Sequence, residues 1–104
     1  EIAVDLETMD PDIKTKGPGW ATGNGAIIGV AMAVEGWKGY FPLRHPGGGN
    51  FDEKIFFRNF KKMMSLPNRK IFHNAMYDVG WLKHQEIPVN GTLIDTNDSS
   101  SDYR

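Results

Sequence analysis

Hydrophobic and polar positions alternate at the start of the chain. Ile2, Val4 and Leu6 are apolar, and the positions that alternate with them include Asp5 and Glu7. Successive side chains of a β-strand point to opposite faces, so this pattern predicts a strand with one apolar face and one face that carries two carboxylates.

Two further apolar segments predict a β-hairpin. The run from Ala26 to Val34 is short and mostly apolar, which indicates a buried strand. Glu35-Gly36 supplies a turn, and the segment from Trp37 to Leu43 predicts the returning strand. Because proline cannot donate to a neighbouring strand, Pro42 places this strand at an edge of the sheet.

An amphipathic helix is predicted to follow the hairpin. Asp52 is a suitable N-cap, and Phe56, Phe60, Met63 and Met64 follow the spacing of a single apolar stripe. This helix should cover one face of the sheet.

The remaining elements complete an alternating order. Arg69 to Phe72 predicts a short strand, Asn74 caps a helix from Ala75 to about Gln85, and Thr92 to Asp95 predicts a last strand. The segment from Asp10 to Gly25 has no period and is expected to be a long loop. The resulting order, β-β-β-α-β-α-β, predicts an α/β fold: a mixed β-sheet with helices packed on it.

Composition narrows the class of protein. The 104 residues include 12 Lys and Arg against 13 Asp and Glu, with a net charge of −1, so there is no basic surface typical of an autonomous nucleic-acid binder. The absence of cysteine is compatible with a reducing cytoplasm, and no apolar run is long enough to span a membrane, so we expect a soluble protein with no membrane partner. The chain begins without Met and ends without a clear element, so residues 1–104 are expected to form a single but partial domain, truncated at the C-terminus.

The carboxylate pair Asp5 and Glu7 indicates a metal site. Two acidic groups on one face destabilise each other's charged form unless a cation lies between them, and divalent ions favour oxygen ligands. Asp78 lies four residues after Asn74 on the second predicted helix, directly after a strand. If that strand is parallel to the first and adjacent to it, Asp5, Glu7 and Asp78 converge, which suits hydrolysis of a phosphodiester by two metal ions.

The two motifs resemble a known family. Asp5-Leu6-Glu7-Thr8 and Asn74-Ala75-Met76-Tyr77-Asp78 resemble the first two motifs of the DEDD-type 3′-to-5′ exonucleases, and specifically the proofreading domains of polymerase-I-like DNA polymerases, including those of bacteriophages. Tyr40 to His45 and Leu93 to Thr96 resemble strands of the same family.

The resemblance implies a ribonuclease-H-like fold and a metal-dependent exonuclease acting on the 3′ end of single-stranded DNA. It implies two divalent ions, Mg²⁺ or Mn²⁺, held by Asp5, Glu7 and Asp78 as the catalytic residues. Asn74 would position the substrate, together with Thr8 and Tyr77, although Tyr77 is equally expected in the core. A covalently linked polymerase domain and a location in the cytoplasm of a bacterium or a phage-infected host cell also follow from the resemblance.

One part of the family pattern is missing. The family completes its site with a Tyr or His followed four residues later by Asp, and no such pair occurs in this chain. We therefore expect the isolated chain to be weakly active or inactive. Two alternatives stay open: a non-catalytic nucleic-acid-binding or structural module, and an RNA-directed exonuclease of the same superfamily. His73 is expected to be a hydrogen-bonded junction residue, and His45 a surface residue.

Overall fold

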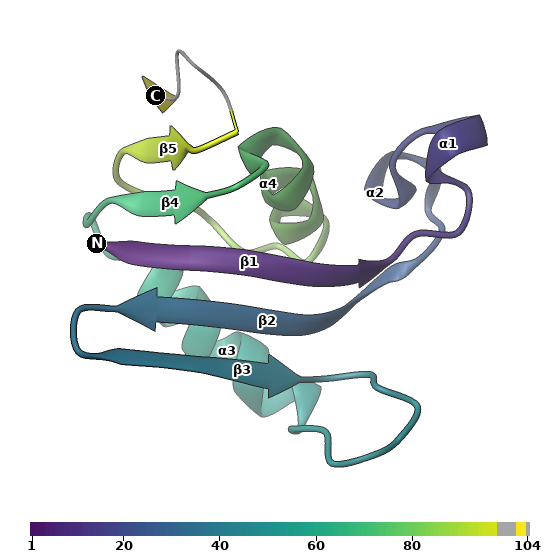
Figure 1. Cartoon of the computed structure of the whole chain (residues 1–104), viewed down its shortest axis with the longest axis horizontal. Helices are drawn as coiled ribbons and strands as arrows, with labels where there is room; N and C mark the ends of the chain where they lie inside the picture. Colours follow the sequence, from purple (N-terminus) through teal and green to yellow (C-terminus); the bar gives the residue numbers. More distant parts are fainter. Residues whose placement is uncertain (98–101, 104) are drawn as a thin grey trace.

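The computed structural model describes residues 1–97 and the backbone of residues 102–103. Its strands form one sheet in the order β3-β2-β1-β4-β5-β6 (Figure 1). The elements are β1 (Ile2–Met9), α1 (Ile13–Lys16), α2 (Gly19–Thr22), β2 (Ala26–Val34), β3 (Trp37–Pro42), α3 (Glu53–Met64), β4 (Lys70–Phe72), α4 (Ala75–His84), β5 (Leu93–Asp95) and β6 (Asp102–Tyr103).

The sheet is mixed, as the order of elements predicts. β1 pairs with β2 in the antiparallel sense and with β4 in the parallel sense, and β5 is parallel to β4. The hairpin of β2 and β3 leaves β3 at the edge, where Pro42 predicts it to be. β6, which pairs with β5, was not predicted from the sequence. None of the helices in the described part of the chain is both long and apolar enough to cross a membrane.

The core lies between the sheet and two helices. α3 and α4 both lie behind the sheet in Figure 1, so the opposite face is open. The alternation in β1 is confirmed, because Ile2, Val4 and Leu6 are buried while Asp5 and Glu7 are exposed. The buried cluster joins apolar side chains of both helices and the sheet: Ile2, Val4, Leu6, Ile27, Val30, Met32, Leu43, Phe60, Met64, Phe72, Ala75, Trp81, Leu82 and Ile87.

The N-cap and the apolar stripe predicted for helix α3 are both present in the structure. The side chain of Asp52 accepts a hydrogen bond of 3.1 Å from the Ile55 amide, which satisfies one of the unpaired donors of the first turn. Phe60 and Met64 are buried, and Phe56 and Met63 pack beside them. The predicted apolar stripe therefore faces the sheet.

The segment from Asp10 to Gly25 is more ordered than predicted. It contains two single-turn helices, α1 and α2, and is not a loop throughout. The Asp10 carboxylate accepts a hydrogen bond of 2.9 Å from the Gly19 amide, and Asn24 donates one of 2.6 Å to Asp12. The side chain of Trp20 packs on Gly80 of α4, where a β-carbon would lie 2.3 Å from its ring. Hydrogen bonds within the segment and packing on a distant helix together hold it in place, and the packing has no signature in the local sequence.

Lys70 is a charged residue in the core. Its side chain is fully buried, and its ammonium group donates hydrogen bonds to the backbone oxygens of Leu66, Asn68 and Asn90 and to the Asn68 side chain. Burial lowers its pKa below the ordinary value. Lys70 thus joins the start of β4 to the two connections that flank it.

Candidate active site

The strands β1 and β4 place the first motif beside the second helix. They are parallel, with Ile2 opposite Lys70 and Ala3 opposite Ile71, so their carboxyl ends lie at the same edge of the sheet. β4 ends at Phe72, whereas β1 continues to Met9. The predicted adjacency is confirmed, and the part of β1 that carries Asp5 and Glu7 extends past β4.

Asp78 is a buried carboxyl group with acidic neighbours. Only 4% of the residue is exposed. Its pKa is raised to about 7, mainly by burial and also by the charges of Asp5 and Asp95, while a hydrogen bond from the Leu6 backbone lowers it in part. Ion pairs in the described part of the chain involve neither Asp5 nor Asp78. The pair Asp5 and Asp78 is therefore a place where a cation would lower the electrostatic free energy.

The carboxylate of Glu7 is directed elsewhere. It accepts a hydrogen bond of 2.7 Å from the Tyr40 hydroxyl, and His45 Nε2 lies 4.0 Å from the same oxygen. Within residues 1–97, no three His, Cys, Asp or Glu side chains form a group that could hold a metal ion. The expected group of three carboxylates is therefore not present in residues 1–97: the charge of Asp5 acts on Asp78, whereas Glu7 belongs to a separate hydrogen-bonded group.

Thr8 and Tyr77 contact each other. The Thr8 hydroxyl lies 2.9 Å from the Tyr77 hydroxyl, which donates a hydrogen bond of 2.7 Å to Asp10. The Tyr77 ring is half-buried and packs edge-on against the core residue Trp81, with ring centroids 6.4 Å apart. Burial is the main cause that raises the Tyr77 pKa. These contacts tie the end of β1 to α4 and to the segment that begins at Asp10, a residue that the sequence did not single out.

Asn74 does not cap α4 with its side chain, contrary to the prediction. Its side chain makes no capping hydrogen bond and is exposed. Asp95, at the end of β5, accepts the hydrogen bond from the Ala75 amide at 2.9 Å and another from the Asn97 amide at 2.9 Å. The cap comes from a strand twenty residues away, so the Asn74 side chain stays at the surface, one helical turn from Asp78.

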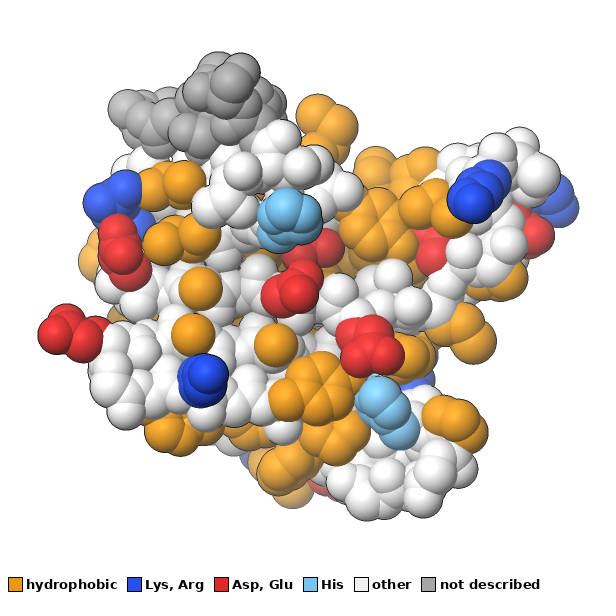
Figure 2. Space-filling view, in the orientation of Figure 1, with side chains coloured by type: hydrophobic (Ala, Val, Ile, Leu, Met, Phe, Trp, Pro, Cys, Tyr) orange, Lys and Arg blue, Asp and Glu red, His pale blue; other side chains and the backbone are white. Residues whose placement is uncertain are grey.

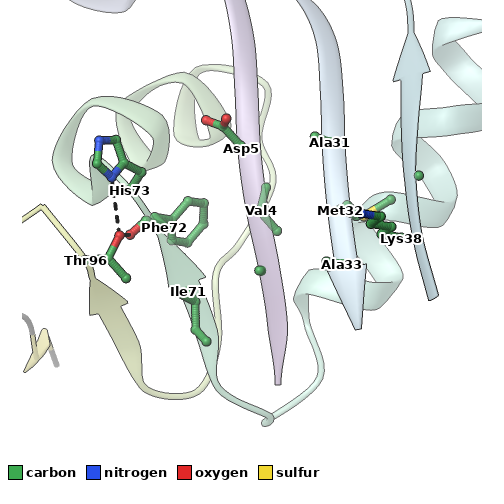
Figure 3. A pocket seen from close by; sticks show the side chains of 12 residues that line it. Val4, Asp5, Ala31, Met32, Ala33, Lys38, Ile71, Phe72, His73 and Thr96 are labelled. Atoms are coloured by element: carbon green, nitrogen blue, oxygen red, sulfur yellow. Dashed lines mark hydrogen bonds between the residues drawn. The ribbon is translucent and has the colours of Figure 1, made fainter. Parts of the chain in front are cut away.

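A shallow groove crosses the open face of the sheet next to Asp5. It has a volume of about 600 Å³, and Asp5 and His73 lie toward one end of it (Figure 3). His73 Nδ1 lies 3.4 Å from the Thr96 hydroxyl, as expected for a junction residue. Figure 2 shows acidic and histidine side chains gathered toward the carboxyl ends of β1, β3 and β4 on this face. Its lining includes four small residues of the sheet and one larger apolar side chain: Ala3, Ala31, Ala33, Gly39 and Ile71.

Comparison with known proteins gives one partial relationship. Over 51 residues the chain is 49% identical to a DNA-directed DNA polymerase of Pseudomonas phage M6. The match spans 47% of this chain and 8% of that polymerase, so the chain corresponds to a small part of its length. No family model matches the chain, and no solved structure matches it.

Proposed function

We propose that the chain is the 3′-to-5′ exonuclease domain of a DNA polymerase and hydrolyses the terminal phosphodiester of single-stranded DNA. The observation that carries the proposal is that the buried Asp78, in the first turn of the helix that follows β4, feels the charge of Asp5 on the adjacent parallel strand β1. The partial identity to a phage DNA polymerase supports it, because the two motifs resemble those of polymerase-linked exonucleases. A mixed sheet with both long helices on one face agrees with a ribonuclease-H-like fold.

The donor chemistry fits hard divalent cations. Asp5, Glu7 and Asp78 offer only carboxylate oxygens, which Mg²⁺ and Mn²⁺ prefer. A bound cation would offset the burial and the nearby negative charges that raise the Asp78 pKa. When bound, such ions would supply a hydroxide nucleophile and stabilise the leaving oxygen of the phosphodiester. We assign Asp5 and Asp78 to one part of the metal site and Glu7 to the other.

The substrate side of the site would be formed by residues that flank these carboxylates. Asn74 is exposed beside Asp78 and has an amide that can contact a phosphate or a sugar. Thr8 and Tyr77 hydrogen bond to each other, so they would shape the path of the DNA strand from the end of β1. The proposed ligand is the 3′ end of single-stranded DNA, delivered by a linked polymerase domain in the cytoplasm of a bacterium or a phage-infected cell.

A nuclease assay on the protein as it is naturally made tests this function. We expect digestion of a 5′-labelled single-stranded DNA in shortening steps from the 3′ end, dependent on Mg²⁺ or Mn²⁺. Asp5→Ala and Asp78→Asn should each abolish it. Glu35→Gln, in the exposed hairpin turn, removes a carboxylate away from the site and should leave the rate unchanged. Absence of digestion by the wild type, or full activity of Asp5→Ala, would overturn the proposal.

A second function, a non-catalytic nucleic-acid-binding module, has one observation in its favour. Glu7 is hydrogen-bonded to Tyr40 and does not join Asp5 and Asp78 in a three-carboxylate group. This module would bind single-stranded DNA without hydrolysing it, and Asp5→Ala would leave the affinity unchanged. A DNA-binding measurement run beside the nuclease assay separates the two functions.

A further inference from the structure

Glu7 is connected to a strand that is not its neighbour in the sheet. Glu7 lies on β1 and Tyr40 on β3, with β2 between them, yet the Tyr40 hydroxyl donates a hydrogen bond of 2.7 Å to Glu7 Oε2. The Tyr40 ring must therefore cross the surface of β2 to reach it. Side chains on directly paired strands are the usual partners, so a contact across an intervening strand requires a special arrangement.

Gly29 of β2 makes this crossing feasible. It lies directly opposite Glu7 in the pairing of β1 with β2. A β-carbon at Gly29 would lie 1.7 Å from the Tyr40 hydroxyl oxygen and 2.4 Å from the ring carbon that bears it. Only glycine leaves the space that the phenol occupies, so the position of Gly29 and the bond from Tyr40 to Glu7 depend on each other.

His45 also hydrogen bonds to the Tyr40 hydroxyl. Its Nε2 lies 2.5 Å from the Tyr40 hydroxyl, and the two rings meet edge to face with centroids 5.6 Å apart. The single phenolic proton is donated to Glu7, so His45 Nε2 must carry the proton that it shares with the Tyr40 oxygen. The order of donation is thus from His45 to Tyr40 and from Tyr40 to Glu7.

The backbone around His45 is also fixed. Asn50 accepts a hydrogen bond of 2.8 Å from the His45 amide and donates one of 3.0 Å to the His45 carbonyl. Before it, the Leu43 amide donates to Ile28 of β2 at 2.9 Å, and the Leu43 side chain is buried. The imidazole is therefore presented to Tyr40 by an anchored loop, although the sequence indicates only a surface histidine.

We propose that Tyr40 and His45 are positioning residues for Glu7: they hold one of its carboxylate oxygens, which leaves the other oxygen to bind a metal ion. The proposal deepens the exonuclease function and rests on it. Metal-binding carboxylates are commonly oriented by hydrogen bonds from a second layer of residues, and loss of such a partner typically costs about 10-fold to 100-fold in metal affinity or activity.

The test uses variants that remove single contacts in the naturally made protein. Tyr40→Phe removes only the hydroxyl, and Gly29→Ala pushes the ring away without removing any polar group. His45→Ala removes the imidazole, while His45→Gln keeps an N–H donor. Gly47→Ala is the matched control, because a β-carbon there meets nothing within 4 Å.

Three measurements report the effect: nuclease kinetics, Mn²⁺ binding and NMR. We expect Tyr40→Phe and Gly29→Ala to lower kcat on single-stranded DNA and the affinity for Mn²⁺ without DNA, each by about 10-fold or more, with little change in KM. His45→Gln should restore most of what His45→Ala loses, and Gly47→Ala should match the wild type. In ¹⁵N NMR spectra, His45 should carry its proton on Nε2 in the wild type and lose that preference in Tyr40→Phe.

The outcomes separate this inference from the proposed function. A wild type that does not digest DNA, but whose Mn²⁺ affinity falls in Tyr40→Phe, would overturn the exonuclease and support the positioning of Glu7. An active wild type whose kcat and Mn²⁺ affinity are unchanged in Tyr40→Phe and Gly29→Ala would overturn the positioning role alone. Failure of His45→Gln to restore activity, with unaltered His45 signals in Tyr40→Phe, would restrict the group to Tyr40 and contradict the role of His45.

Discussion

The carboxylate of Asp95, the last residue of β5, accepts a hydrogen bond of 2.9 Å from the backbone amide of Ala75, the first residue of α4. Only 4% of Asp95 is exposed. This contact fixes the start of the helix that carries Asp78. It takes the place of the side-chain cap that the sequence predicts for Asn74, the residue just before the helix.

Asp95→Ala should therefore destabilise the fold. Loss of the carboxylate leaves the Ala75 amide without its buried partner, and we expect the free energy of unfolding to fall by about 1–3 kcal/mol. Urea unfolding measures this change. Asn74→Ala is the control and should cost less, because the Asn74 side chain makes no capping bond. Equal losses in the two variants would contradict the assignment of the cap.

The stability of the fold should depend on pH through Asp78. Its pKa in the folded chain is about 7, above the ordinary value of 3.8, so between these values the folded state binds the proton more strongly than the unfolded state. Stability contributed by the protonated carboxyl is present below about pH 4 and is lost as the pH rises toward about 7, by a few kcal/mol in total. Urea unfolding with EDTA should show this decline for the wild type relative to Asp78→Asn. Parallel pH profiles would refute it.

Divalent ions should stabilise the folded chain at alkaline pH. A cation bound by Asp5 and Asp78 binds the folded state only, and at about 100 times its Kd it adds about 2.7 kcal/mol to the free energy of unfolding. Thermal unfolding with and without Mn²⁺ at about pH 8 measures the shift in Tm. Asp5→Asn and Asp78→Asn should lose it, and the exposed Glu35→Gln should keep it. A shift of the same size in all three variants would point to binding elsewhere.

Lys70→Met should be strongly destabilising although methionine is similar in length. The substitution removes the donor for the backbone carbonyls of Leu66, Asn68 and Asn90, and we expect a loss of about 3 kcal/mol or more. Lys62→Met, at an exposed position of α3, is the control and should change stability by less than about 0.5 kcal/mol. Chemical unfolding measures the stability of both variants. A small loss in Lys70→Met would show that the hydrogen bonds from Lys70 to these carbonyls contribute little to stability.

Gly80→Ala should destabilise the chain, which reverses the usual effect of this change in a helix. At an open helical position alanine is favoured by up to about 1 kcal/mol, but here the β-carbon would lie 2.3 Å from Trp20. We expect a loss of about 1–3 kcal/mol and faster trypsin cleavage at Lys14 and Lys16, because α2 can no longer pack on α4. Met76→Ala, on the exposed face of the same helix, is the control. Unchanged cleavage in Gly80→Ala would contradict this packing.

Local sequence patterns predicted most of the fold. Alternation in β1, the β-branched run of β2 and the apolar stripe of α3 each reflect a repeat within a few residues, so they are visible without tertiary contacts. The segment from Asp10 to Gly25 was predicted less well, because its order comes from packing on α4. The cap of α4 also comes from a distant residue. The local pattern predicts Asn74, whereas the structure supplies Asp95 from β5.

The sequence by itself determined the alternation that puts Asp5 and Glu7 on one face of β1, and the position of Asp78 after β4. It could not determine how these side chains are paired, because that depends on contacts between residues far apart in the chain. The tertiary structure buried Asp78 where the charge of the exposed Asp5 acts on it, and it joined Glu7 to Tyr40 across Gly29. Side-chain periodicity is local and can be read from the chain, whereas the direction of a carboxylate depends on which distant donors the fold places next to it.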